Sequence, residues 1–152
     1  MTDRVLNILR RQGKRVHCLF DGDLLEALSS SCIKLLMEQI EQIGSIRKNL
    51  VVFDHQLKPD EYELFISRGI TPMIVPSDKD VYLALECLDV VYSQQTDVLC
   101  VGVNDESMLP ILAKVREKSE ILLISGTKND AENYLPYVDY LITLKDLKEN
   151  VN

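Results

Sequence analysis

Glycine is scarce in this 152-residue sequence, which contains only six glycines. Gly102 and Gly126, the two that lie nearest to predicted strand ends, are isolated from other glycines. They do not form the glycine-rich loop that cradles phosphate groups in nucleotide-binding folds. A domain that binds a nucleotide or another small ligand is therefore the function that the sequence favours least.

Metal-binding pairs of cysteine, membrane spans and secretion signals are also missing. The four cysteines occur without a CxxC or CxH pair, and each lies among apolar residues, which favours buried, reduced thiols over a zinc site. No apolar run is long enough to span a bilayer, and residues 1–15 lack a signal-peptide h-region. We therefore expect a cytoplasmic protein without a membrane partner.

An excess of basic residues is absent as well, because 24 acidic and 17 basic residues give a formal net charge of −7. Proteins that bind nucleic acids mainly through counterion release usually carry a basic face. Basic residues cluster within 10–15, 47–48 and 114–118, and we interpret these clusters as solvated surface. The charge balance weakens the case for tight, general RNA binding and favours a protein partner.

What the sequence does contain is an alternation of apolar strands and amphipathic helices. Apolar runs predict buried strands over 16–20, 47–53, 70–75, 98–102, 120–124 and 138–143. Helical spacing predicts helices over 24–43, 59–67, 77–92 and 105–117, with a helical turn at 131–135. Strands that are nearly continuous apolar runs are typical of a parallel sheet buried on both faces. The predicted fold is a doubly wound α/β domain, with a mostly parallel sheet of five to six strands and helices on both faces.

Residues 15–144 contain all of these elements, and no linker or repeat divides them. Residues 1–14 are interpreted as an N-terminal amphipathic helix, centred on 4–12, that packs on this domain or on a second copy in a homodimer. Residues 145–152 form a polar tail that we expect to fray. In the helix over 77–92, the predicted buried stripe consists of Val81, Ala84, Leu85, Leu88 and Val91.

Acidic and amide side chains follow three of the predicted strands. In chain order they are Asp21 and Asp23, then Asp78 and Asp80, then Asn104, Asp105 and Glu106. Open α/β sheets bind their ligands at the carboxyl ends of the strands, so we expect these carboxylates to gather at one edge. A hard divalent cation would relieve the repulsion between them. The sequence thus predicts a site for Mg²⁺ or Mn²⁺.

Each acid also has a purely structural explanation. Ser77 and Asp80 resemble a capping box, Asn104 can cap the next helix, and Asp21 with Gly22 can form a turn. Asp21 is the strongest candidate, because it ends a buried strand and has no obvious capping role.

Four segments between Val16 and Leu144 carry a more specific pattern. They are VHCLFDGDLL, IGSIRKNLVVFDHQL, GITPMIVPSDKDVYLALECLDVVYSQQTDVLCVGVNDESMLPILAKVREK and YVDYLITL. The third is the most distinctive, because D-V-x-L-A-x-E is followed by a strand and then by D-x-x-x-L-P-x-L. In this order the segments resemble the NYN domain of the PIN-like nuclease superfamily, in particular an uncharacterised archaeal branch.

The resemblance implies a PIN-like, Rossmann-like fold and a Mg²⁺- or Mn²⁺-dependent ribonuclease. In such sites, acids hold the metal that activates water and neutralises charge on the scissile phosphate. Asp21 matches the acid of the family's D-G-x-N motif, and Asp80 matches the acid that opens the third helix. Asp105 matches the first acid of the D-x-D motif. By this resemblance, all three are catalytic residues and metal ligands.

Two positions depart from the family pattern. Leu24 stands in place of the asparagine of D-G-x-N, and Ser107 stands in place of the second acid of D-x-D. The candidate auxiliary residues are Asp23, Asp78, Asn104, Glu106 and Ser107. The leading hypothesis is a metal-dependent endoribonuclease without a protein nucleophile. The alternative is a catalytically impaired NYN-fold module that binds RNA or a protein.

Overall fold

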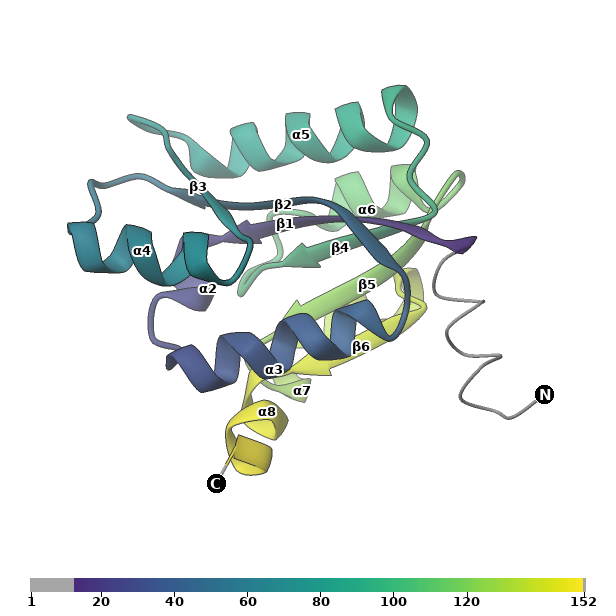
Figure 1. Ribbon diagram of the computed structural model, residues 1–152. Helices are drawn as coiled ribbons and strands as arrows, with labels where there is room; N and C mark the ends of the chain where they lie inside the picture. The colour runs from purple at the N-terminus through teal and green to yellow at the C-terminus, as the bar shows by residue number, and fades with distance from the viewer. Residues whose placement is uncertain (1–12, 152) are drawn as a thin grey trace.

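A single parallel sheet organises the chain in the computed structural model, which describes residues 13–151. Its strands are β1 (Arg15–Asp21), β2 (Ser45–Phe53), β3 (Thr71–Ile74), β4 (Val98–Gly102), β5 (Glu120–Ser125) and β6 (Tyr140–Thr143). The strand order is β3-β2-β1-β4-β5-β6, and all neighbouring strands pair in parallel (Figure 1). The prediction of a doubly wound α/β sheet is therefore confirmed, with six strands and with the chain reversing its order between β1 and β4.

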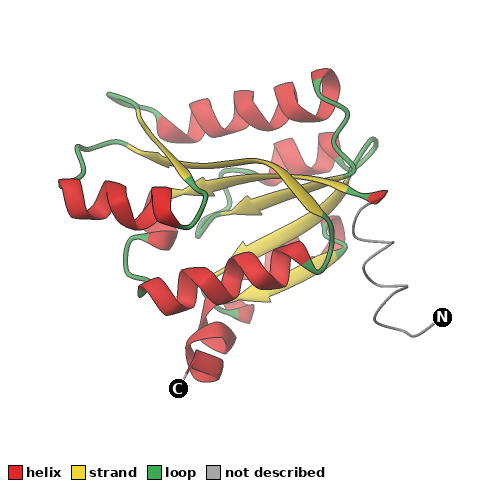
Figure 2. Cartoon of the chain, in the orientation of Figure 1, coloured by secondary structure: helices red, strands yellow, loops and turns green. Residues whose placement is uncertain are grey.

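Helices cover both faces of this sheet (Figure 2). One face carries α2 (Gly22–Leu25), α3 (Ser30–Glu41), α4 (Pro59–Ser67) and α8 (Leu144–Val151). The other carries α5 (Lys79–Ser93), α6 (Leu109–Val115), α7 (Lys128–Ala131) and the 3-10 helix η1 (Glu132–Tyr137). Alternate residues of β1 serve the two layers, because Cys18 and Phe20 pack on the first face and Leu19 packs on the second. Burial on both faces explains why the central strand β4, VLCVG, is apolar throughout.

The sequence predicted a helix near the N-terminus and a frayed tail at the C-terminus. The helix predicted over 4–12 lies outside the described residues. The prediction of a frayed tail is wrong, because α8 runs from Leu144 to Val151 and packs beside α3. Leu144 and Leu147 are buried in the core, and Val151 is half-buried against it. Their spacing places them on one side of a helix, which is enough to anchor an otherwise polar segment.

The long helix predicted over 24–43 is two helices, α2 and α3. Ser29 lies between them as the N-cap of α3, and its hydroxyl accepts a hydrogen bond from the backbone N–H of Cys32 at 3.2 Å. A serine in this role starts a new helix, because it satisfies a donor that has no partner within the helix.

The buried face of α5 differs from the predicted stripe. Val81 and Leu85 are 57% and 60% exposed, whereas Val91 is buried as predicted. Ala84 and Leu88 are partly buried. The buried residues of α5 are Leu83, Cys87, Val90 and Val91. Because this helix carries apolar residues on more than one side, its helical spacing alone did not determine which side faces the sheet.

All four cysteines are buried and free, as predicted. Burial raises the pKa of the Cys87 thiol to about 12, which keeps it protonated and unreactive at neutral pH. Among residues 13–151, no helix combines the length and the apolar character that a membrane crossing requires.

Candidate functional site

The first predicted acid, Asp21, is the last residue of β1, and its side chain is only 10% exposed. Its carboxylate caps α2 by accepting a hydrogen bond from the backbone N–H of Asp23 at 2.9 Å. Gly22 must lack a side chain, because a Cβ there would lie 2.7 Å from the carbonyl oxygen of Val52 and overlap the ring of Phe53. The expectation that Asp21 has no capping role is therefore wrong, and the capping bond fixes its carboxylate at the end of the strand.

A lysine that was absent from the predicted site lies among these acids. The Lys79 ammonium is 3.1 Å from Asp21 Oδ1, 2.5 Å from Asp23 Oδ2 and 4.0 Å from Asp54 Oδ2. The Lys79 side chain is only 12% exposed. Burial acts to lower the pKa of Lys79, but hydrogen bonds to Asp23 and Asp21 outweigh it, and the pKa is raised above its ordinary value. Lys79 is therefore a firmly charged cation inside the acidic edge.

Asp78 starts α5 and takes the left-handed backbone conformation, with φ 56° and ψ 45°. Its carboxylate makes no capping bond and accepts a hydrogen bond from the Ser77 hydroxyl at 3.2 Å. The predicted capping box of Ser77 and Asp80 is not formed. Instead, the turn at Asp78 places Lys79 and Asp80 together in the first turn of α5.

Asp80 lies within electrostatic range of the other two predicted acids. Its pKa is raised, first by burial and then by the charges of Asp105 and Asp21, and Lys79 offsets part of this effect. All three acids lie at or after the carboxyl ends of strands in the same parallel sheet. The structure thus brings Asp21, Asp80 and Asp105 to one edge of the sheet, as the strand-end rule predicted.

Asp105 lies in the exposed loop between β4 and α6, a region predicted to be helical. Its Oδ1 accepts hydrogen bonds from Ser107, at 3.0 Å from the backbone nitrogen and 2.5 Å from the hydroxyl. Its carbonyl oxygen accepts a hydrogen bond from the buried Tyr134 hydroxyl, which in turn accepts one from the Met108 N–H at 3.2 Å. Ser107, at the position of a family acid, therefore serves as a donor that orients Asp105, and Tyr134 braces the loop.

The remaining candidate residues have varied surroundings. Leu24 is 4% exposed and belongs to the core, so this position offers nothing to a ligand. Glu106 accepts a hydrogen bond from the side-chain amide of Asn133. The exposed Asn104 lies beside Gly126, since a Cβ on that glycine would be 3.4 Å from Asn104 Oδ1. Among the candidate auxiliary residues, Asp23 is the one that pairs with Lys79.

Asp54 and His55, which directly follow β2, were missed by the sequence analysis. His55 Nδ1 lies 3.3 Å from Asp54 Oδ1, and its Nε2 lies 3.2 Å from Glu26 Oε1. The hydrogen bond with Asp54, opposed by desolvation and aided by Glu26, raises the pKa of His55. The same strand-end rule that selected Asp21 selects Asp54 when it is applied to β2.

The donor set suits a hydrated magnesium or manganese ion. Within residues 13–151, no three acidic, histidine or cysteine side chains are close enough to hold one metal ion together. Mg²⁺ does not need such a cage, because it usually keeps several waters and binds through one or two carboxylates. Asp21, Asp80 and Asp105 are the residues that could hold it.

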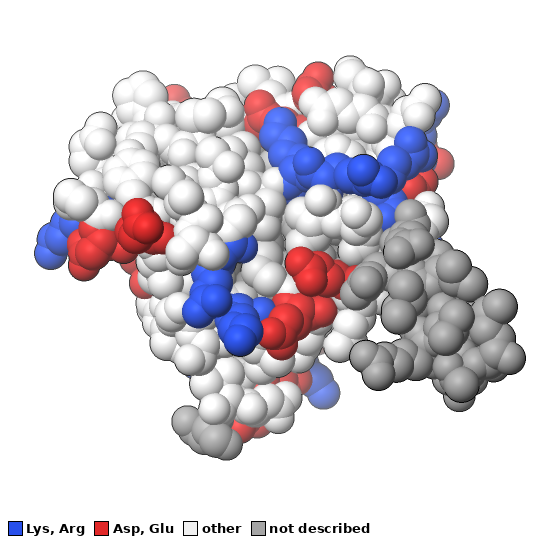
Figure 3. All heavy atoms as spheres, viewed as in Figure 1, with Lys and Arg blue, Asp and Glu red and all other residues white. Residues whose placement is uncertain are grey.

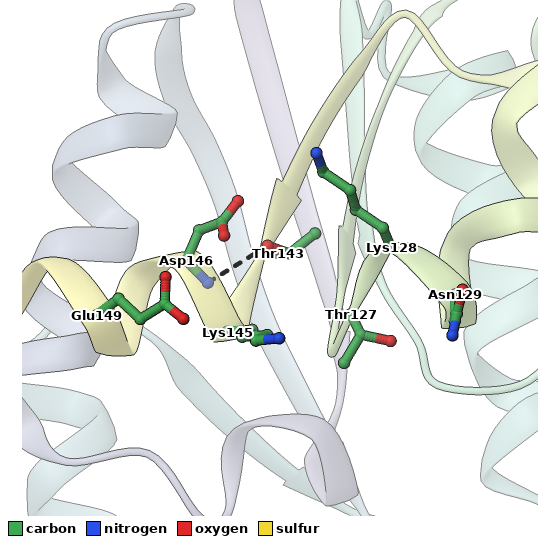
Figure 4. A pocket seen from close by; sticks show the side chains of 7 residues that line it. All are labelled: Thr127, Lys128, Asn129, Thr143, Lys145, Asp146 and Glu149. Carbon is green, nitrogen blue, oxygen red and sulfur yellow. Dashed lines mark hydrogen bonds between the residues drawn. The ribbon is translucent and has the colours of Figure 1, made fainter.

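Two grooves open along α7 and α8 next to the acids. The first, of about 360 Å³, includes Asp23, Asn104, Thr127, Lys145 and Lys148 in its lining. The second, of about 380 Å³, is lined by Thr127, Lys128, Asn129, Thr143, Lys145, Asp146 and Glu149 (Figure 4). They share Thr127 and Lys145, and the Lys145 side chain extends from α8 towards Thr127. The first groove brings the ammonium groups of Lys145 and Lys148 next to Asp23, whereas the second groove combines lysines with the carboxylates of Asp146 and Glu149.

Charges of both signs are interspersed on the face of the molecule shown in Figure 3, where lysine and arginine side chains lie next to acidic ones. On this face, a polyanion would meet short stretches of positive charge that acidic side chains border.

Comparisons with known proteins find a similar fold and an uncharacterised relative. No family model matches the sequence. An uncharacterised protein of Methanocaldococcus jannaschii is 23% identical over 138 residues, which are 89% of this chain and 58% of that protein. The chain thus spans little more than half the length of this relative. A crystal structure of a protein of unknown function from Vibrio parahaemolyticus matches with a TM-score of 0.72 at 11% identity, covering 88% of this chain and 94% of that one. This likeness shows a shared fold.

Proposed function

We propose that this protein is a metal-dependent endoribonuclease of the NYN, PIN-like type, with a hydrated Mg²⁺ or Mn²⁺ at the edge formed by Asp21, Asp80 and Asp105, bound directly by one or two of these carboxylates and through water by the rest. The observation that supports it best is that Asp21, Asp80 and Asp105 lie at or after the ends of strands of one parallel sheet whose carboxyl ends meet at the same edge. A bound cation would offset the burial and the neighbouring negative charges that raise the pKa of Asp80.

The side chains have separate tasks in this proposal. The metal supplies charge neutralisation at the scissile phosphate and an activated water. Ser107 and Tyr134 hold Asp105 and its loop in place. Lys145 and Lys148 line the groove next to Asp23, where they would bind the phosphates that flank the cleaved bond. We propose the cytoplasm as the compartment, because the four buried cysteines are free.

The test is cleavage of a labelled single-stranded RNA by wild type and Asp105→Asn, with Mn²⁺ and with a chelator. Asp89→Asn is the matched control, because it makes the same change of charge at an exposed position of α5. We expect cleavage by the wild type and the control only when Mn²⁺ is present, and none by Asp105→Asn. Absence of cleavage by the wild type with Mn²⁺ would refute the proposal.

A module that binds RNA or a protein without cleaving it is the second candidate, and the ion pairs of Lys79 favour it. They compensate the charges of Asp21 and Asp23 without a metal. Under this candidate, the wild type would bind single-stranded RNA equally well with Mn²⁺ and with a chelator, as measured by fluorescence anisotropy, and would leave the RNA intact.

A further inference from the structure

Lys79 lies in the middle of the acidic edge and is almost covered. Its ammonium contacts two carboxylates at the junction of β1 and α2, at 3.1 Å from Asp21 and 2.5 Å from Asp23. A third carboxylate, that of Asp54 after β2, is 4.0 Å away. Lysine side chains that are 12% exposed are uncommon unless they are paired, and this one has acidic partners at the ends of two strands.

The backbone before Lys79 contributes to this arrangement. Asp78 adopts a left-handed conformation, which aspartate tolerates better than most residues other than glycine and asparagine. The turn makes Lys79 the first residue of α5, from which its side chain reaches the acids that follow β1. The ion pairs thus join the start of α5 to the end of β1.

We infer that Lys79 is a built-in counter-cation, whose ammonium competes with a divalent metal for Asp21 and Asp23 and thereby limits how tightly the site binds metal. The inference rests on the proposed function and specifies how metal occupancy of that site is regulated. Two cations that share one carboxylate repel each other, so metal binding at Asp21 requires the ammonium to withdraw. The flexible four-carbon stem of lysine permits this movement.

The test compares Mn²⁺ binding, measured by isothermal titration calorimetry without RNA, between the wild type and Lys79→Met. Methionine keeps an unbranched apolar side chain and removes the charge. Lys114→Met is the matched control, because it makes the same charge change at an exposed residue of α6 that lines neither groove. We expect Lys79→Met to bind Mn²⁺ at least about tenfold more tightly, and the control to change affinity by no more than about twofold.

The same variant has a second readout that needs no metal. Without the ammonium, Asp21 and Asp23 repel each other, so Lys79→Met is expected to unfold at a lower urea concentration than the wild type. Added Mn²⁺ should restore part of this loss. If Lys79→Met fails to fold, as judged by circular dichroism, Lys79→Gln replaces it, because its amide can still donate to Asp21.

The outcomes separate this inference from the ribonuclease proposal. Equal or weaker Mn²⁺ binding by the folded variant overturns the inference and leaves the ribonuclease proposal to the cleavage assay. Tighter Mn²⁺ binding by the variant, without RNA cleavage by the wild type, supports the inference and refutes the ribonuclease proposal. If neither the wild type nor the variant binds Mn²⁺, both are overturned.

Discussion

At the scale of single residues, Tyr134 holds the loop that carries Asp105. Its hydroxyl hydrogen-bonds to the Asp105 carbonyl oxygen and to the Met108 N–H, and burial raises its pKa to about 12, so it remains a donor at neutral pH. Tyr134→Phe removes both bonds and is expected to lower the free energy of unfolding by about 1–3 kcal/mol. Urea unfolding measures this loss. The half-buried Tyr137 provides the control Tyr137→Phe, and equal losses in the two variants would contradict the bracing role.

His17 gives a prediction for the dependence of stability on pH. It is buried in β1, with Nδ1 3.0 Å from the Thr96 hydroxyl, whose own proton is donated to the Val90 carbonyl oxygen at 2.6 Å. Nδ1 must therefore donate its proton to Thr96. Burial, followed by the positive charge of Lys48, lowers the pKa of His17 below its usual 6.5.

Because the folded state binds this proton less readily than the unfolded chain, the contribution of His17 is complete above pH 6.5. It is lost as the pH falls from 6.5 towards the lower pKa of the folded state. We expect urea unfolding to show a lower stability at pH 5.5 than at pH 7.5, and a smaller difference in His17→Gln. An unchanged difference in that variant would assign the pH dependence to other groups.

At the scale of elements, α8 is the segment for which the structure most changes the expectation from the sequence. Leu147 is 1% exposed, so Leu147→Ala is expected to lower the free energy of unfolding by about 2–5 kcal/mol. The neighbouring exposed Glu149 gives the control Glu149→Ala, which should change it by less than about 0.5 kcal/mol. Chemical denaturation of both variants measures the difference. A small effect of Leu147→Ala would mean that α8 is detached in solution.

The central strands β4 and β5 could be predicted from the sequence because each is a buried apolar run, and burial on both faces implies parallel pairing. The starts of β2 and β6 were predicted two residues away from their positions, because these strands are only partly buried there. The sequence determined the buried sides and the ends of the helices less well. Val81 and Leu85 were assigned to the wrong side of α5, since apolar residues lie all around that helix. The break between α2 and α3 depends on one cap, Ser29, within a run of three serines.

The sequence predicted those residues of the candidate site whose position follows from the order and direction of the strands. Asp21, Asp80 and Asp105 follow strands whose carboxyl ends meet, and they do gather there. Topology also brings Lys79 to this edge, because it stands between Asp78 and Asp80, but it does not determine whether the lysine side chain points to the acids or to solvent. The contact also depends on the left-handed backbone conformation of Asp78, which no local sequence pattern predicted.

At the scale of the whole molecule, a formal charge of −7 must be reconciled with a nucleic-acid substrate. Long-range attraction would be weak or repulsive, so affinity has to arise from a few well-placed cations. Lys145 and Lys148 meet this requirement, because α8 positions them in the groove beside Asp23 and Asn104. The basic cluster at 114–118 provides a comparison that lies outside both grooves.

The double variant Lys145→Glu/Lys148→Glu should therefore bind single-stranded RNA more weakly than the wild type in the presence of a chelator. The slope of log K against log salt concentration should fall by about 1.4, because each phosphate contact to a single strand contributes about 0.7. Lys114→Glu/Lys118→Glu alters the net charge by the same amount and should leave most of the slope intact. Fluorescence anisotropy over a series of salt concentrations measures both. If the two double variants lose affinity equally, RNA responds to the overall charge of the protein and the groove is not its binding site.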